Sequence, residues 1–529
     1  MCKFLRERID SRGKVVNLHC LCPQASVGEG FGTHIGEATL DDSAIMLNQV
    51  ITNTQSFVNS ITREERKKYG QFFTSELSAE YMASLFDVDQ SRKKLRILDA
   101  GAGTGILSVA LVERLRTVGY QGEISLTCYE TDEKVIPLLA ANLYQLRETY
   151  GAEYDIRRQN YITSQSFYIQ PYLAMEGEGY DLVIGNPPYM KLPKEAPEAQ
   201  VMQEVCHGAP NMYFLFMAMG VYNLSWGGEL VYIVPRSWTS GAYFEAFRRY
   251  LFDRCAIEQI HLFESRDKVF DSEPVLQETM IIKVRNTEKR PDKVIVTSST
   301  TSDFMNIEKF TPSYHTIVGK NGYVYLVTNS YQENVLSRMG KLGHTLPSVN
   351  LKMCTGLIVD YRTTEELRDE YEEGACPLFY SCHIKEGRIR WPQGKAGEYI
   401  LTDKAGHLQR NTNYLFVKRL TSKEEHRRLQ CAVYLSTDYP QYRHISTQNK
   451  VNYIECESEE VVYGLYALFS SSLYDEYYRI LNGSTQVNST EMNHVPVPSK
   501  DIIRAMGSEI RQLELTEENC NKIVDKWIK

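Results

Sequence analysis

Short apolar runs alternate with segments of helical periodicity between residues 96 and 284. A continuous apolar run predicts a buried strand, whereas apolar residues that recur once per helical turn predict a helix. The predicted strands lie at 96–100, 125–130, 154–157, 182–184, 227–235, 257–263 and 278–284, and the predicted helices at 106–112, 133–144 and 211–220. This alternation predicts a doubly wound α/β sheet with ligands past the carboxyl ends of its strands.

The pattern changes beyond about residue 290, where short strand-like runs alternate with Gly, Asn and Asp turns. These runs lie at 323–328, 378–381, 399–402, 415–419 and 452–455, and helical patterns lie at 42–61 and 501–527. We therefore expect a mixed α+β C-terminal part. The expected domains are an N-terminal helical extension (1–60), the α/β domain (61–290), the mixed domain (291–500) and a C-terminal helix (501–529).

The composition is that of a soluble globular protein, with 529 residues, 43% hydrophobic residues and 24% charged residues. The sequence contains neither an apolar run long enough to cross a membrane nor an N-terminal signal core. The twelve cysteines form no Cys-x-x-Cys pair, which fits reduced thiols in a bacterial cytosol or nucleoid. Because no Cys/His spacing matches a common zinc site, we predict no metal.

The segment 181–189, Asp-Leu-Val-Ile-Gly-Asn-Pro-Pro-Tyr, combines a predicted strand with a rigid loop rich in acceptors. Pro187 and Pro188 fix φ and carry no N–H group, while Tyr189 adds a flat aromatic face. The Asn186 Oδ1 atom and a proline carbonyl can accept both hydrogens of an exocyclic amine, which localises the nitrogen lone pair for attack on an electrophilic methyl group. The alternative is an ordinary turn, because Asn-Pro marks turns in many proteins.

A glycine-rich turn lies upstream of this loop, where a predicted strand runs into a predicted helix. Gly101, Gly103 and Gly105 let the backbone approach a ligand closely. Glu130 ends the next predicted strand, where a carboxylate can accept both hydroxyl groups of a ribose. NAD enzymes and plain strand-to-helix turns share the glycine pattern, so the downstream proline loop is what favours a methyl-donor site.

Taken in order, Asp-Ala-Gly-Ala-Gly-Thr-Gly, Tyr-Glu-Thr-Asp and Asn-Pro-Pro-Tyr resemble the motifs of the S-adenosylmethionine-dependent N6-adenine DNA methyltransferases. With Tyr-Gly-Gln-Phe-Phe-Thr-Ser at 69–75 and a long C-terminal part, the chain is similar to their gamma class, found in restriction–modification systems. The match covers roughly residues 65–285, with a second short match at 482–498. It implies a Rossmann-like methyltransferase sheet followed by a DNA target-recognition domain.

The resemblance also implies roles for single residues. Phe73 and Thr74 would close over the methionine end of the cofactor, although Ser75 alternatively caps the helix that follows. Asn160 would accept from the adenine N6 of the cofactor, and Phe270 would pack against an extruded base or belong to the core. The implied catalytic residues are Asn186, Pro187, Pro188, Tyr189 and Phe270. The implied cofactor-binding residues are Phe73, Thr74, Asp99, Gly101, Gly103, Gly105, Glu130, Asn160 and Asn186.

The net charge of −8 does not exclude DNA binding, because a local basic surface supplies phosphate contacts whatever the total charge. Basic residues outnumber acidic ones between 411 and 450, with aromatic residues interleaved, and a small-polar segment at 481–488 matches the C-terminal signature of the family. The alternatives are a solvated surface with buried tyrosines and a tight loop. The candidate DNA-binding residues are Lys418, Arg419, Lys423, Arg443, Ser484, Thr485, Gln486 and Asn488.

The expected activity is methyl transfer from S-adenosylmethionine to N6 of an adenine that is flipped out of double-stranded DNA. Two alternatives use similar chemistry, on an RNA adenine or on a protein glutamine amide, and a third is a non-catalytic DNA-binding specificity protein. We expect a monomer, and we expect any restriction endonuclease partner to be a separate chain.

Overall fold

The computed structural model describes residues 7–9, 15–17, 43–60, 74–167, 179–263, 279–300, 304, 306–422, 425–482 and 485–529. The chain divides into two compact units at residue 42. In the first unit, β1 (Glu7–Ile9) pairs antiparallel with β2 (Val15–Asn17). Everything below concerns the second unit. Across the described ranges, every helix is too short or too polar to cross a membrane.

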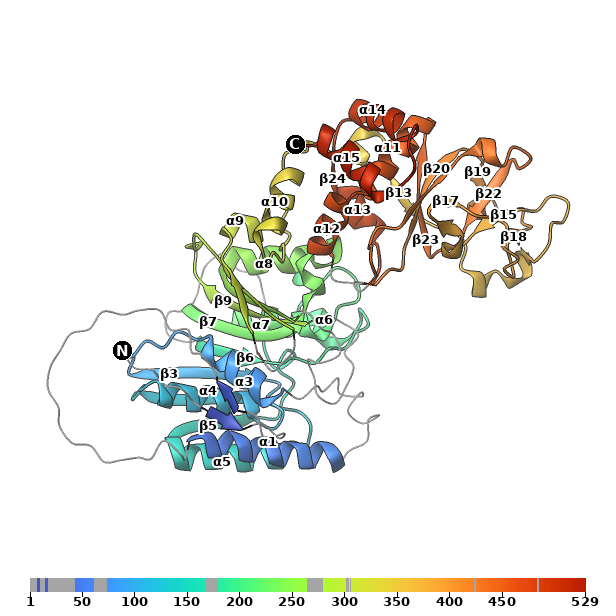
Figure 1. Ribbon diagram of the computed structural model, residues 1–529. Coiled ribbons are helices and arrows are strands. Elements are labelled where there is room, and N and C mark those ends of the chain that lie inside the picture. Colours follow the sequence, from blue (N-terminus) through green and yellow to red (C-terminus); the bar gives the residue numbers. More distant parts are fainter. Residues whose placement is uncertain are drawn as a thin grey trace. The chain divides into compact units, whose positions relative to one another are not determined.

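The sheet that carries the site contains nine described strands. They are β3 (Lys94–Ala100), β4 (Glu123–Tyr129), β5 (Ala152–Arg157), β6 (Tyr180–Gly185), β7 (Leu224–Pro235), β8 (Cys255–Phe263), β9 (Thr279–Asn286), β10 (Ile295–Ser299) and β11 (Glu308–Phe310). Their spatial order is β11-β10-β8-β9-β7-β6-β3-β4-β5, and Figure 1 labels β3, β5, β6, β7 and β9 of this sheet. Strands β5, β4, β3, β6 and β7 are parallel, and the chain order reverses between β3 and β6. Ligands of doubly wound sheets bind at such a reversal, so the predicted α/β class is confirmed.

Helices cover both faces of this sheet. They are α1 (Ser43–Ser60), α3 (Glu76–Ser84), α4 (Ile106–Thr117), α5 (Ile136–Tyr150), α6 (Pro197–Val201), α7 (Met212–Tyr222) and α8 (Glu245–Arg254). Successive strand residues point to opposite faces. Ile97 and Ile184 accordingly pack in a buried cluster with α1, α3, α4 and α5, whereas Leu98 and Val183 pack with α7 and α8. Because both faces are covered, polar groups of the site gather at the strand ends.

The C-terminal half is mixed α+β, as predicted. A six-stranded sheet has the order β13-β23-β20-β21-β17-β16 and a five-stranded sheet the order β14-β18-β15-β22-β19. The strands are β13 (Met353–Thr355), β14 (Leu367–Arg368), β15 (Cys376–Phe379), β16 (Ile384–Lys385), β17 (Gly387–Ile389), β18 (Tyr399–Ile400), β19 (Gln409–Arg410), β20 (Asn413–Lys418), β21 (Cys431–Tyr434), β22 (His444–Thr447) and β23 (Val451–Cys456). Further elements are α9 (Tyr314–Ile317), α10 (Ser330–Met339), β12 (His344–Thr345), α11 (Glu459–Phe469), α12 (Ser472–Leu481), α13 (Ser489–His494), β24 (Pro496–Val497), α14 (Lys500–Ile510) and α15 (Glu517–Trp527).

Two predicted elements are wrong in detail. The run at 323–328 forms only an isolated bridge between Val318 and Val324, and its apolar residues are buried because it connects the two halves. The single helix predicted at 501–527 is two helices, α14 and α15. Thr516 starts the second one, since its Oγ1 atom accepts the Asn519 N–H at 3.3 Å.

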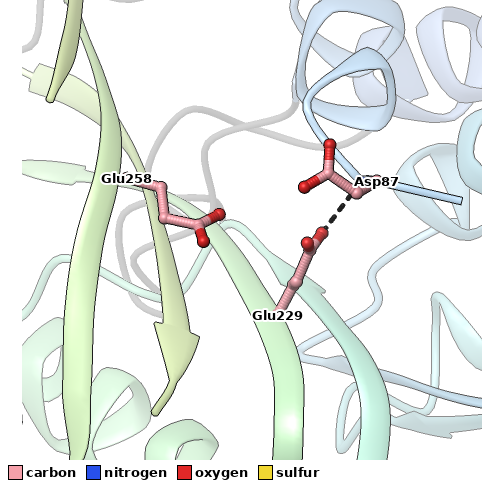
Figure 2. Close-up of side chains that lie close together, drawn as sticks. All are labelled: Asp87, Glu229 and Glu258. Atoms are coloured by element: carbon pink, nitrogen blue, oxygen red, sulfur yellow. Dashed lines mark hydrogen bonds between the residues drawn. The ribbon is translucent and has the colours of Figure 1, made fainter. Parts of the chain in front are cut away.

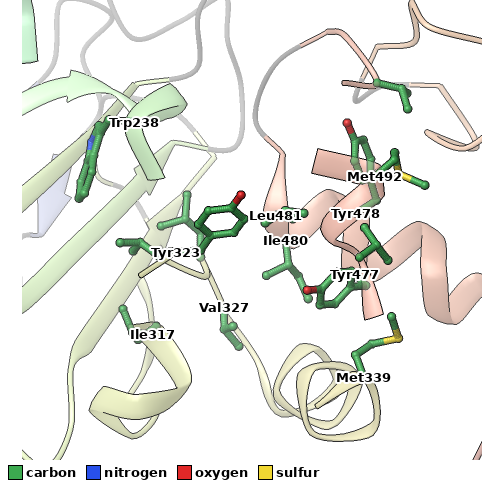
Figure 3. Close-up of a cluster of buried hydrophobic side chains, with 14 of the residues drawn as sticks. Trp238, Ile317, Tyr323, Val327, Met339, Tyr477, Tyr478, Ile480, Leu481 and Met492 are labelled. Carbon is green, nitrogen blue, oxygen red and sulfur yellow. The ribbon is translucent and has the colours of Figure 1, made fainter. Parts of the chain in front are cut away.

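The two halves share one buried core (Figure 3). Trp238 and Tyr323 approach it from the nine-stranded half, and Tyr477, Ile480 and Leu481 approach it from α12. This continuity fixes the position of the second half against the site edge of the first, and it predicts that neither half folds well alone.

Candidate active site

The predicted catalytic loop follows β6 directly. At Gly185 a Cβ atom would lie 2.8 Å from the Tyr232 ring, so glycine is required at the strand end. The next residue, Asn186, donates its Nδ2 hydrogen to the Thr74 Oγ1 atom at 3.1 Å. Ser75 caps α3 by accepting the Ser78 N–H at 3.3 Å, as its alternative interpretation predicted. The start of α3 and the end of β6 therefore meet, although they are far apart in the sequence.

The ring of Tyr189 is fixed by the neighbouring strand β7. Its hydroxyl donates to the Ile233 carbonyl at 3.0 Å, and its ring meets the Tyr213 ring edge-on with centroids 6.2 Å apart. Burial raises the pKa of the Tyr189 hydroxyl well above its usual value, so this group stays protonated. Its phenol is an anchor, not a base.

A cavity of about 360 Å³ opens at the strand ends, within the range of about 300–1,000 Å³ typical of small-molecule sites. Its lining comprises Thr74, Gly101, Ala102, Gly103, Thr104, Ile106, Leu107, Tyr129, Glu130, Thr131, Gln159, Asn160, Tyr161, Asn186, Pro188, Met190, Leu192, Glu198, Met212 and Phe216. The lining thus contains predicted residues from four strand ends, but Asp99, Gly105, Pro187 and Tyr189 are not part of it.

The three glycines of the turn do different work. All have a positive φ, +73° at Gly101, +55° at Gly103 and +87° at Gly105, a region that disfavours side chains. A Cβ atom at Gly103 would meet nothing within 4 Å, whereas one at Gly105 would lie 3.0 Å from the Leu139 side chain. Gly105 therefore serves the packing of α4 against α5, and the first two glycines serve the cavity.

Asp99 lies behind the turn, in the core. Its Oδ2 atom accepts a hydrogen bond from the Ser108 hydroxyl at 2.7 Å, which ties β3 to α4. Complete burial raises the pKa of this carboxyl from 3.8 to about 7. The geometry gives Asp99 a structural role.

Glu130 is held rigidly at the cavity wall. Its Oε2 atom accepts the Gly103 N–H at 2.9 Å, and its Oε1 atom accepts the N–H groups of Thr131 and Asp132, both at 2.8 Å. Burial raises the pKa of this carboxyl, and the three N–H donors oppose that rise. A carboxylate oriented in this way fits the predicted recognition of a diol.

Asn160 has a different environment from the one its sequence position suggested. Its Oδ1 atom accepts the N–H groups of Ile162 and Thr163, both at 3.0 Å, and its Nδ2 group donates to the Glu198 Oε1 atom at 2.8 Å. Glu198 belongs to α6 and lines the cavity. Sequence reasoning missed Glu198 because this residue lies in none of the motifs.

An acidic cluster elsewhere in the sheet has the spacing of a metal site but is filled by the chain itself. Asp87, Glu229 and Glu258 converge, and the Asp87 N–H donates to Glu229 at 2.9 Å (Figure 2). The Lys283 ammonium lies 3.0–3.2 Å from all three carboxylates, and Arg285 also pairs with each of them. This cluster is an ion-pair network that ties α3's C-terminal turn to the sheet.

Two candidate DNA-binding segments come together in the C-terminal half. Residues 420 and 486 form a β-bridge. The Arg419 Nη2 atom donates to the Gln486 Oε1 atom at 3.4 Å, and the Nη1 atom of the same arginine donates to the Asn449 carbonyl at 3.0 Å. Thr485 and Gln486 are exposed, and Leu420 beside them is 43% exposed. The basic segment and the C-terminal signature thus share one surface.

The remaining DNA-binding candidates fall in separate places. Arg443 is exposed, Lys418 is half-buried at the end of β20, and Asn488 caps α13 by accepting the Thr490 N–H at 2.9 Å. The interleaved aromatics Tyr414, Phe416 and Tyr434 are buried in the core of the six-stranded sheet, as the alternative interpretation predicted. Four predicted residues lie outside the described ranges, namely Phe73, Phe270, Lys423 and Ser484.

Comparison with known proteins gives a consistent picture. Residues 116–270 match the family described as Eco57I restriction-modification methylase. The chain is 32% identical over 501 residues to the Type II methyltransferase M.PstI of Providencia stuartii, covering 91% of this chain and 97% of that protein. It is 32% identical over 482 residues to the Type II methyltransferase M.BsuBI of Bacillus subtilis, covering 89% and 93%.

Among solved structures, a nuclease-deletion mutant of the Type ISP restriction-modification enzyme LlaGI in complex with a DNA substrate mimic is similar in fold, with a TM-score of 0.50 and 12% identity. The similarity covers 84% of this chain and 55% of that one.

Proposed function

This chain belongs to the Type II DNA methyltransferases, and we propose that it transfers a methyl group from S-adenosylmethionine to N6 of an adenine in a specific duplex site. One observation carries the proposal: the Asn186 amide, held by Thr74, lies on the same cavity as the glycine turn and Glu130. The cavity therefore places two features side by side. One is an acceptor for an exocyclic amine, and the other is a binding site for a cofactor that contains a nucleoside.

The residues present fit S-adenosylmethionine. Gly101 and Gly103 give the backbone a close approach, Glu130 presents an oriented carboxylate for the ribose, and Met212 and Phe216 supply apolar wall. When bound, S-adenosylmethionine supplies an electrophilic methyl group on a sulfonium centre. The chain needs to place an amine opposite that methyl and to exclude water, which is catalysis by positioning.

The catalytic loop supplies the positioning groups. Because the Nδ2 atom of Asn186 donates to Thr74, the Oδ1 atom is the end of the amide assigned to accept an N6 hydrogen. A carbonyl of Pro187 or Pro188 accepts the other hydrogen, and this draws the N6 lone pair out of the adenine ring. Tyr189, anchored to Ile233, stacks on the adenine, and Phe270 remains the candidate for its opposite face.

Adenine N6 is unreachable inside a stacked duplex, so the target base is flipped into the site. The C-terminal half contacts the duplex through the shared surface of Arg419, Thr485 and Gln486, together with Lys418 and Arg443. We assign the chain as a monomer in the bacterial cytosol, and any restriction endonuclease that acts with it as a separate chain. The nine described cysteines are free thiols, which fits a reducing compartment.

The alternatives on RNA adenine or protein glutamine are less well supported. The two Type II methyltransferases match this chain through its C-terminal half as well as its site. An enzyme for a small or single-stranded target has no evident use for such a half, whereas reading duplex sequence requires one.

The test is methyl transfer from labelled S-adenosylmethionine to unmethylated genomic DNA, followed by nucleoside analysis and mapping of the modified positions. The expected product is N6-methyladenine confined to one short sequence, and Asn186→Ala should remove it. Label in cytosine, or label only in RNA or protein, would contradict the proposal.

A further inference from the structure

The segment after the catalytic loop contributes to the lining of the cofactor cavity. At the strand ends the order is β6, β3, β4, β5, so Asn186 after β6 and Asn160 after β5 are separated by three strand spacings, about 14 Å. Glu198 follows β6 in the chain, yet its carboxylate bonds to Asn160 at 2.8 Å. The connection from β6 to α7 therefore reaches across to the far end of the cavity, with Met190, Leu192 and Glu198 on its lining.

At this end of the cavity, both the carbonyl oxygen and the amino group of the Asn160 side chain already form hydrogen bonds within the protein. Its carbonyl oxygen already accepts two backbone N–H groups, of Ile162 and Thr163, and has no lone pair left for a third donor. Its amino group donates to Glu198. The carboxylate of Glu198, by contrast, accepts at up to four positions, and only one of its bonds is to Asn160.

We propose that Glu198 is the residue that reads the 6-amino group of the cofactor's adenine, with Asn160 as a positioning residue that holds its carboxylate in place. This inference rests on the proposed use of S-adenosylmethionine. It assigns purine specificity to α6, on the segment that also bears the catalytic loop, and not to the residue at the end of β5.

The chemistry of the two purine edges makes the assignment specific. Adenine presents an amino donor at position 6, and hypoxanthine presents a carbonyl acceptor there. An ionised carboxylate is acceptor-only, so it favours the amine and opposes the carbonyl, because two acceptors would face each other without a hydrogen. A glutamine at 198 keeps an oxygen for Asn160 and adds an amino group that donates to a carbonyl.

The experiment is isothermal titration of the full chain with S-adenosylhomocysteine and with S-inosylhomocysteine, for the wild type and for Glu198→Gln. The wild type should prefer the adenosyl compound by about 10- to 100-fold, the range of one hydrogen bond to a charged group. Glu198→Gln should lose adenosyl affinity and gain inosyl affinity, so that the preference falls by at least about tenfold.

Two further variants make the result decisive. Glu195→Gln removes an exposed carboxylate from the same segment and should leave both affinities unchanged. Glu198→Asp keeps the acceptor on a shorter arm, and should weaken adenosyl binding while retaining the preference. It also serves if the glutamine variant fails to fold, because loss of the preference in a folded aspartate variant would overturn the inference.

The outcomes separate the two proposals. One outcome is that the wild type binds S-adenosylhomocysteine while Glu198→Gln lowers the affinities for the two compounds equally or changes neither affinity. In that case the assignment of Glu198 is wrong, whereas the proposal that the cofactor is S-adenosylmethionine is retained. If the wild type binds no S-adenosylhomocysteine, the cofactor proposal is wrong and this inference with it.

Discussion

The two halves of the molecule hold their functional polar groups in different ways. At the cavity, Glu130 and Asn160 are each fixed by at least two backbone N–H donors. In the C-terminal half, Thr485, Gln486 and Arg443 lie exposed on turns and strand ends. A site that positions one small cofactor needs side chains that are oriented before binding, whereas a surface that reads DNA needs side chains that reach outward.

The largest expected effect comes from a buried carboxylate at the junction of the two halves. Glu491 is buried and accepts from the Ser240 hydroxyl at 3.2 Å, from the Tyr478 hydroxyl at 3.3 Å and from the Asn482 amide. Glu491→Ala leaves these groups unsatisfied and should lower the free energy of unfolding by about 3 kcal/mol. Chemical denaturation measures this value.

Glu491→Gln is the matched control, because an amide keeps an oxygen for the donors around it. Burial raises the pKa of Glu491, so an uncharged isostere should cost less than half as much as alanine. Equal losses for the two variants would contradict the role assigned to these hydrogen bonds.

A second comparison separates packing from binding within the glycine turn. Gly105→Ala places a Cβ atom 3.0 Å from Leu139 at a φ of +87°, and should destabilise the fold by about 2 kcal/mol. Gly103→Ala meets no protein atom within 4 Å, so it should cost about 1 kcal/mol of stability but weaken cofactor binding more strongly than Gly105→Ala does. Thermal unfolding and cofactor titration give the two values. The opposite ranking in cofactor affinity would refute this division.

The pH dependence of stability tests whether the Asp99 carboxyl belongs to the core and not to the cavity. Its pKa is raised on folding from 3.8 to about 7, so the folded state binds the extra proton between these values and stability falls as pH rises through that window. The slope is at most about 1.4 kcal/mol per pH unit. Asp99→Asn removes this term, so the stability of the variant relative to the wild type should rise from pH 4 to pH 7. A pH-independent difference would contradict the burial argument.

The smallest effect is expected at the exposed surface. Arg419→Ala should weaken DNA binding about uniformly across sequences and reduce the slope of log affinity against log salt by about one. Arg147→Ala changes a half-exposed arginine on α5 that pairs with Glu148, so it is the control and should change neither quantity. Fluorescence anisotropy at several salt concentrations tests both variants. An unchanged slope for Arg419→Ala would remove that residue from the interface.

The sequence was informative where a feature depends on the local conformation of the backbone. Strand-to-turn motifs such as Gly101–Gly105 and Asn186–Tyr189 require particular residue types at adjacent positions, so the pattern is visible in the chain. The C-terminal half lacks such local rules. Its buried run at 323–328 resembles a strand because burial alone selects apolar residues, and its tyrosines interleave with basic residues because strands alternate faces.

By itself the sequence determined the α/β class, the glycine turn, the loop of residues 186–189 and the family, because each depends on short-range geometry or on motifs in order. Only the tertiary structure decided that Asp99 and Gly105 belong to the packing, that Glu198 reaches Asn160 across the cavity, and that Arg419 meets Gln486. Those facts depend on which segments, distant in the sequence, come together in the fold. Burial of the shared core determines this more than any local pattern does.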